Sequence, residues 1–229
     1  MTIGGLQKVS LTDYPDRLSA VIFTQGCNFR CPYCHNPELV EPHLYRDPIP
    51  EDDVVAFLES RLGRLKGVVV TGGEPTIHHD LLRLLRRIRR LGLFIKLDTN
   101  GSAPHALEQL IAERLLDYVA VDIKSSVDSY SRATGVFVRT EDIRESVEMV
   151  ISSGLRHELR MTFLESFVPL DELRSVADLA RGCGLFLVQP FEPSKTLDPR
   201  LLKLPRPSLE KLERVRRILQ ASGLPAMLR

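Results

Sequence analysis

The stretch Gly67-Val68-Val69-Val70-Thr71-Gly72-Gly73-Glu74-Pro75 contains the pattern on which the fold prediction rests. Its β-branched core predicts a buried strand over residues 67–71, and the two glycines predict a turn where that strand ends. Residues 81–91 follow, with apolar side chains spaced as on one face of a helix. The stretch therefore predicts a strand, a turn and a helix in succession.

The same unit recurs along the chain, and this repetition predicts the fold class. Six strand–helix units are typical of a parallel α/β fold. A complete eight-unit barrel takes about 250 residues, so 229 residues predict an incomplete parallel (β/α)6 barrel, with an open doubly wound sheet as the alternative. We expect one domain over residues 1–229, with an N-terminal extension at 1–17 and a C-terminal loop and helix at 190–229. The expected strands are 18–24, 67–71, 93–99, 118–123, 157–163 and 185–189, and the expected helices are 51–62, 81–91, 104–115, 140–152, 170–181 and 208–220.

The composition excludes several classes of protein. Lys and Arg number 31 against 30 Asp and Glu, and a net charge of +1 argues against a nucleic-acid binder that relies on bulk electrostatics. No apolar run approaches the length of a membrane helix, and the N-terminus lacks the pattern of a secretory signal. We therefore expect a cytoplasmic protein with no membrane partner.

The four cysteines are distributed unevenly. Cys27, Cys31 and Cys34 lie within eight residues directly after the first expected strand, and Cys183 lies far along the chain. A disulfide framework would spread its cysteines, so this distribution favours a thiolate site in a reducing compartment. A [4Fe–4S] cluster normally has four cysteine ligands, and three would leave one iron open to a substrate.

Residue chemistry alone allows three other interpretations of the cysteines. A zinc site would need a fourth ligand such as His35 or His43. A glutaredoxin-like dithiol would use Cys31 and Cys34 and leave Cys27 unexplained. Buried structural cysteines would pack as small hydrophobic residues.

The cysteine spacing, with Tyr33 as the aromatic residue before the last cysteine, resembles the signature of the radical S-adenosylmethionine (SAM) superfamily. The resemblance implies a [4Fe–4S] cluster on Cys27, Cys31 and Cys34, and SAM as the bound cofactor. It also implies that Gly72, Gly73 and Glu74 contact the methionine amino group. The alternative for these three residues is an ordinary turn capped by Glu74.

Two later motifs resemble those of the activases of glycyl-radical enzymes, the residues 98–101 (Asp-Thr-Asn-Gly) and 122–124 (Asp-Ile-Lys). The resemblance implies that both line the cofactor pocket and that Lys124 reaches a carboxylate or ribose oxygen. It also implies a monovalent cation beside Asp98, Thr99 and Asp122. For residues 98–101 a plain turn is the alternative, since Asn-Gly is a frequent turn pair. The expected cofactor-binding residues are Tyr33, His35, Gly72, Gly73, Glu74, Asp98, Asn100, Asp122, Lys124, Thr162 and Gln189.

These polar residues share a position that is independent of any resemblance. Each lies at or near the C-terminal end of an expected strand, which is where parallel α/β folds build their sites. No side chain beyond the cluster and cofactor is expected to act as an acid or base, because the cofactor carries the chemistry.

The reaction is implied by the shortness of the chain and by its flanking motifs. Residues 11–15, 25–28, 34–37 and 189–199 look like those of the activating proteins of anaerobic ribonucleoside-triphosphate reductase. Such an activase cleaves SAM reductively and abstracts a hydrogen atom from a glycine of its large partner, with flavodoxin or ferredoxin as electron donor. Alternatives are a pyruvate formate-lyase-type activase, which would have histidine in place of Glu192, and a small-molecule enzyme such as 7-carboxy-7-deazaguanine synthase.

The arginine-rich helix expected at 81–91 allows two interpretations. Its apolar stripe predicts a helix with a solvated basic outer face. A docking patch for an acidic electron donor is the alternative. Cys183, between a helix and a strand, is expected to be structural.

Overall fold

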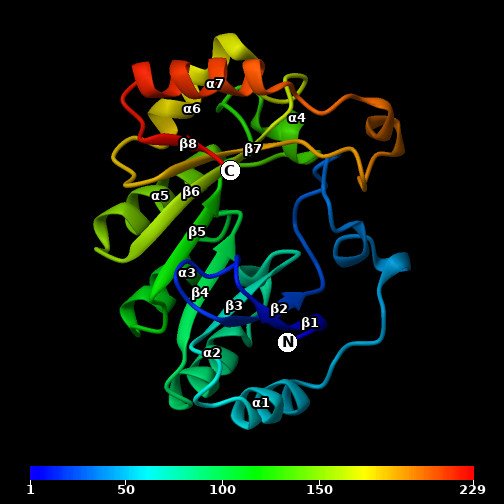
Figure 1. Ribbon diagram of the computed structural model, residues 1–229, viewed down its shortest axis with the longest axis vertical. Helices are drawn as coiled ribbons and strands as arrows, with labels where there is room; N and C mark the ends of the chain where they lie inside the picture. The colour runs from blue at the N-terminus through cyan, green and yellow to red at the C-terminus, as the bar shows by residue number, and fades with distance from the viewer. The chain divides into compact units, whose positions relative to one another are not determined.

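The computed structural model describes residues 1–229 (Figure 1). The contacts divide the chain into two compact units. The first, unit 1, comprises residues 1–28, 38–99 and 105–119, and the second, unit 2, comprises residues 29–37, 100–104 and 120–229. The strand order follows the chain from β1 to β8, and β5 (Tyr118–Asp122) begins in unit 1 and ends in unit 2. β1 and β8 lie at the two ends of this order, so the α/β sheet is an open, incomplete barrel.

The parallel strands of unit 1 are mostly buried on both faces, whereas β1 is partly exposed. β1 (Ile3–Ser10) pairs antiparallel with β2 (Ser19–Thr24), and β2, β3 (Gly67–Gly72) and β4 (Phe94–Thr99) pair in parallel. Val68, Val69 and Val70 are fully buried, as expected of a parallel strand covered on both sides. The helices associated with this unit are η1 (Pro37–Leu39), η2 (Pro42–Leu44), α1 (Glu51–Ser60), η3 (Pro75–Ile77), α2 (Leu81–Arg90) and α3 (Pro104–Ala112).

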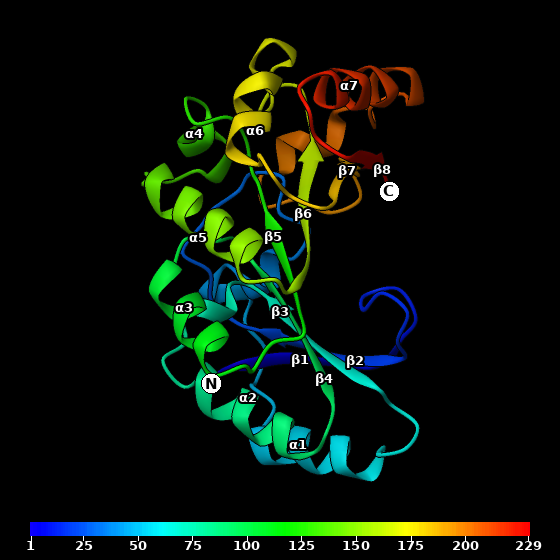
Figure 2. The same cartoon turned by 90° about the vertical axis from the view of Figure 1, so that its left-hand side faces the viewer.

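Unit 2 continues the parallel arrangement. β6 (Arg156–Phe163), β7 (Phe186–Pro190) and β8 (Ala226–Leu228) pair in parallel. Helices α6 (Leu173–Leu179) and α7 (Leu209–Ala221) lie side by side, as both views show (Figure 2). The remaining helices are α4 (Tyr130–Thr134), α5 (Thr140–Ser152), η4 (Leu170–Glu172) and η5 (Pro199–Lys203). The longest helices have 13 residues, and none is both long and apolar enough to cross a bilayer.

All six expected strands are present, but the prediction missed two others. β1 lies within the expected N-terminal extension, where two glycines and polar residues hide its alternation, and β8 has only three residues. The expected helix at 170–181 is wrong in its bounds, because the 3-10 turn η4 opens the segment and α6 ends at Leu179. The expectation of a single domain stays a prediction.

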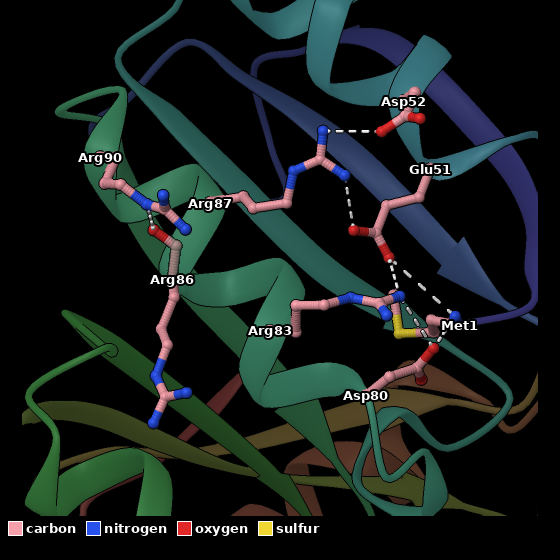
Figure 3. A network of polar contacts seen from close by, with 8 residues as sticks. All are labelled: Met1, Glu51, Asp52, Asp80, Arg83, Arg86, Arg87 and Arg90. Carbon is pink, nitrogen blue, oxygen red and sulfur yellow. Dashed lines mark hydrogen bonds and ion pairs between the residues drawn. The ribbon is translucent and has the colours of Figure 1, made fainter.

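Four of the five arginines of α2 are paired with acidic side chains, and Figure 3 shows two of them, Arg83 and Arg87. Arg83 and Arg87 both contact Glu51 at the start of α1, at 3.0 and 2.7 Å, and the amino group of Met1 contacts Asp80. Arg86 pairs with Glu113 and Arg89 with Asp117. Acidic side chains therefore compensate most of the basic face, which weakens the case for a docking patch for an acidic electron donor.

Candidate functional site

The Gly72–Gly73 turn at the end of β3 packs against the chain's own backbone. Gly73 N donates to Thr24 O at 2.9 Å, and Glu74 N donates to Gly26 O at 2.8 Å. A Cβ on Gly73 would lie 2.0 Å from Gly26 O. Gly72 has a φ of +123°, a backbone conformation that residues other than glycine rarely adopt. Glycine is therefore required here by the segment leading into Cys27, whether or not a ligand also approaches.

Glu74 is buried and tightly held. It is 1% exposed, caps η3 by accepting from Thr76 N at 3.1 Å, and accepts from Thr76 Oγ1 at 2.5 Å. Thr99 Oγ1, at the end of β4, donates to the same oxygen at 2.6 Å. The structure thus shows the capped turn that was the alternative reading, and it also joins two of the expected site residues, Glu74 and Thr99. A contact of Glu74 with a cofactor amine stays a prediction.

Cys31 and Cys34 lie in unit 2, in a segment held at both ends. Cys34 N donates to Cys31 O at 3.0 Å, which folds the two cysteines into one turn. Arg30 N donates to Thr134 O in α4 at 2.7 Å, and Asp198 N donates to Pro32 O at 2.9 Å. The turn is therefore anchored by α4 and by the loop before η5. Cys27 belongs to unit 1.

Two ring side chains flank these cysteines. Tyr33 is 4% exposed, its ring lies 5.4 Å from that of Phe167, and its hydroxyl donates to Lys124 O at 3.4 Å. The His35 ring lies 6.3 Å from that of Phe191, and burial lowers the pKa of His35. Tyr33 thus connects the cysteine turn to the end of β5.

Asp122, at the end of β5, is the centre of a charged cluster in unit 2. Arg160 Nε lies 2.8 Å from Asp122 Oδ1, and Lys124 Nζ lies 3.0 Å from Oδ2. Burial alone would raise the pKa of Asp122, but the charges and hydrogen bonds of Arg160 and Lys124 outweigh it and hold that pKa well below its usual value. Asp122 is therefore ionised, and both of its oxygens already have cationic partners.

Sequence reasoning missed Arg160. It lies on β6 two residues before Thr162, and therefore on the same face of the strand. The signal available was the alternation of β6, in which Arg160 falls between the apolar residues Leu159 and Met161 and shares a face with Thr162. The side chain is 12% exposed and also lies 3.8 Å from Glu158.

The structure gives the positions of three other expected site residues, Thr162, Gln189 and Asn100. Thr162 and Gln189 are direct neighbours in the β6–β7 ladder. Asn100 is buried, and its side chain accepts from Ser102 N at 2.9 Å, which is the turn that its sequence predicts. Their binding roles stay predictions, as does the cation beside Asp98, Thr99 and Asp122.

The thiols suit an iron–sulfur cluster in their chemistry. Cys31 is 8% exposed, and burial raises the pKa of its thiol to about 11 in spite of nearby Lys124. A buried thiol of this kind loses its proton when a metal supplies positive charge. No group of three or more Cys, His, Asp and Glu side chains is arranged as a metal site in the structure, so the ligand set of Cys27, Cys31 and Cys34 stays a prediction.

The sequence profile of the radical SAM superfamily matches residues 21–180, which is most of the chain. The chain therefore belongs to the radical SAM superfamily, and it uses the [4Fe–4S] cluster and SAM of that family.

Relatives within the superfamily differ in activity. The chain is 32% identical over 221 residues to a "putative glycyl-radical enzyme activating enzyme" of Methanocaldococcus jannaschii, covering 94% of this chain and 90% of that protein. It is 29% identical to a "probable GTP 3′,8-cyclase" of Thermococcus kodakarensis, over 85% of this chain and 65% of the cyclase. It is 26% identical to a 7-carboxy-7-deazaguanine synthase of the same organism, over 79% and 77%.

A solved structure supports the fold. SuiB of Streptococcus suis superposes with a TM-score of 0.67 at 16% identity, over 91% of this chain and 48% of SuiB. The chain therefore spans about half the length of SuiB, and the likeness concerns the fold alone.

Proposed function

We propose that this protein activates a glycyl-radical enzyme by abstracting a hydrogen atom from one glycine Cα of that partner, and that the partner is anaerobic ribonucleoside-triphosphate reductase. The observation that carries the proposal is the 32% identity to the activating-enzyme relative over nearly the full length of both chains. The flanking motifs at residues 11–15 and 189–199 favour the reductase as the partner.

The protein's own residues bind and orient in this proposal. Cys27, Cys31 and Cys34 would hold the cluster, which together with SAM supplies one-electron cleavage and hydrogen-atom abstraction. Glu74, held by Thr76 and Thr99, offers a carboxylate to the methionine amine.

The groups in unit 2 would serve the other parts of the cofactor. Lys124, held by Asp122, offers an ammonium to a carboxylate or ribose oxygen. Tyr33, packed on Phe167, excludes water beside Cys31. Exclusion of water and a short distance to the target C–H are what a radical abstraction requires of the protein.

The test is electron paramagnetic resonance of the partner. The reconstituted, reduced protein is incubated with SAM and the anaerobic reductase, and a glycyl doublet is expected. A reductase variant with alanine in place of the radical glycine is the control and should give no doublet. Cleavage of SAM without a doublet in the normal reductase would exclude the reductase as target.

A small-molecule substrate is the second candidate, and the identities to a GTP cyclase and a deazaguanine synthase favour it. In that case the protein would consume GTP or a free pterin in the absence of any partner protein. Product analysis after incubation with each compound separates the candidates, because an activase leaves both unchanged.

A further inference from the structure

Lys96 is a buried ammonium for which the proposed function has no use. It lies on β4 in unit 1 and is 1% exposed. A buried cation is strongly unfavourable unless an anion and hydrogen bonds replace its hydration. Lys96 therefore needs nearby groups that compensate for the lost hydration of its charge.

The surroundings of Lys96 include both kinds of partner. Its Nζ donates to the carbonyl oxygen of Asp13 at 2.6 Å and lies 3.5 Å from Oδ1 of Asp98. The ring of Tyr118 lies 5.3 Å from Nζ and presents its face to the charge. The carbonyl and the ring solvate the ammonium, but of these three only the carboxylate of Asp98 balances its charge.

The strand geometry keeps the two charged groups close together. Residues 96 and 98 are two apart on β4, so their side chains point to the same face. Asp98 is itself only 12% exposed. The Lys96 ammonium thus lies next to the Asp98 carboxylate, on the side toward the N-terminal end of β4.

The loop between β1 and β2, which contains Asp13 and Tyr14, packs next to Lys96 and Tyr118. Tyr14 is 2% exposed, its ring meets that of Tyr118 at 6.0 Å, and a Cβ on Gly67 would lie 2.9 Å from it. The loop thereby presents Asp13 O to Lys96. Asp13 and Tyr14, from the stretch 11–15 that the sequence singled out and the proposed function left without a role, thus contact Lys96 and its neighbour Tyr118.

We propose that Lys96 is a positioning residue that acts as the built-in counter-cation of Asp98, so that this carboxylate needs no monovalent cation from solution. The inference rests on the proposed place of Asp98 in the SAM pocket. The ammonium of Lys96 takes the place, at Asp98, of the monovalent cation that the sequence resemblance implies. In this role Lys96 acts through Asp98 and not by contact with SAM.

The test compares SAM binding in choline chloride with binding in potassium or sodium chloride at equal ionic strength. The wild-type dissociation constant should change less than about twofold, because the ammonium is part of the chain. Lys96→Met should bind SAM about tenfold more weakly in choline and regain most of the affinity in sodium or potassium. Sodium NMR relaxation should reveal a bound ion in Lys96→Met and none in the wild type.

Two controls separate this role from simple support of the fold. Lys66→Met removes an exposed lysine of the same unit and should behave as wild type. In Lys96→Met/Asp98→Asn the alkali cation should no longer restore affinity, because its carboxylate is gone.

Loss of affinity in Lys96→Met that no alkali cation restores would overturn the proposal, and so would unchanged affinity in choline. If Lys96→Met does not fold, the wild-type measurement still decides, since a several-fold tightening by potassium would also overturn it. Binding of SAM requires no partner protein, so failure of the activase proposal would appear separately, as the missing glycyl doublet.

Discussion

Gly73 lies against Gly26 so closely that a Cβ at position 73 would be 2.0 Å from the carbonyl oxygen of Gly26. The obstacle is backbone rather than a flexible side chain, and Glu74 N also donates to this oxygen. The turn after β3 therefore fixes the residue that precedes Cys27.

We expect Gly73→Ala to lower the free energy of unfolding by about 3 kcal/mol, because backbone must move to admit the methyl group. It should also lower the iron retained after reconstitution, since the displaced segment carries Cys27. Urea unfolding and iron analysis measure the two effects. Gly184→Ala is the control, because a Cβ there meets nothing within 4 Å, and equal stability of the two variants would contradict the packing argument.

The pairing of Arg160 with Asp122 predicts a second effect. Arg160→Met removes one partner of a largely buried ion pair and should destabilise the protein by about 1–2 kcal/mol. It should also weaken SAM binding, and Arg160→Lys should recover part of the loss because it keeps the charge. Arg156→Met, an exposed arginine on the same strand, is the control. Normal SAM affinity in Arg160→Met would show that Asp122 needs no help from Arg160.

The three clustered cysteines and Cys183 should respond differently to substitution. Cys27→Ala, Cys31→Ala and Cys34→Ala should each lose the visible absorbance of the cluster and the cleavage of SAM, because three thiolates leave no spare ligand. Cys183→Ala should keep both, although Cys183 is also a buried thiol, at 6% exposed. A brown, active Cys31→Ala protein would refute the ligand set.

The contact between α1 and α2 predicts an acid-sensitive step in stability. Burial alone would raise the pKa of Glu51, but its hydrogen bonds to Arg83 and Arg87 outweigh it and lower that pKa below its usual value. A carboxyl whose pKa is lower in the folded state stabilises that state above its unfolded pKa of about 4.3, and the contribution is lost as the pH falls through the folded pKa.

We therefore expect Glu51→Gln to cost about 1 kcal/mol at pH 7, and we expect its difference from wild type to shrink as the pH falls below about 4.3. Urea unfolding of the metal-free chains across this pH range measures it. Glu59→Gln, at an exposed position of α1, should differ little from wild type at any pH. A difference between Glu51→Gln and wild type that stays constant as the pH falls would mean that Glu51 acts through packing.

The Gly72–Gly73 pair and the arginines of α2 differ in the structure from what their sequence patterns suggested. The Gly72–Gly73 pair suggested room for a ligand, but the structure shows contact with Thr24 and Gly26. The arginines of α2 suggested a basic face, but carboxylates of neighbouring segments compensate four of the five. In both cases the missing information was which other segment lies alongside, and local patterns do not contain it.

The sequence by itself determined the alternation of strands and helices and the short spacing of three cysteines, because both depend on residues close together in the chain. Only the tertiary structure decided that Thr99 holds Glu74, that Arg160 holds Asp122, and that the loop carrying Asp13 reaches Lys96. These partners are 25, 38 and 83 residues apart. Strand register and packing bring them together, and the pattern within a single segment does not specify either.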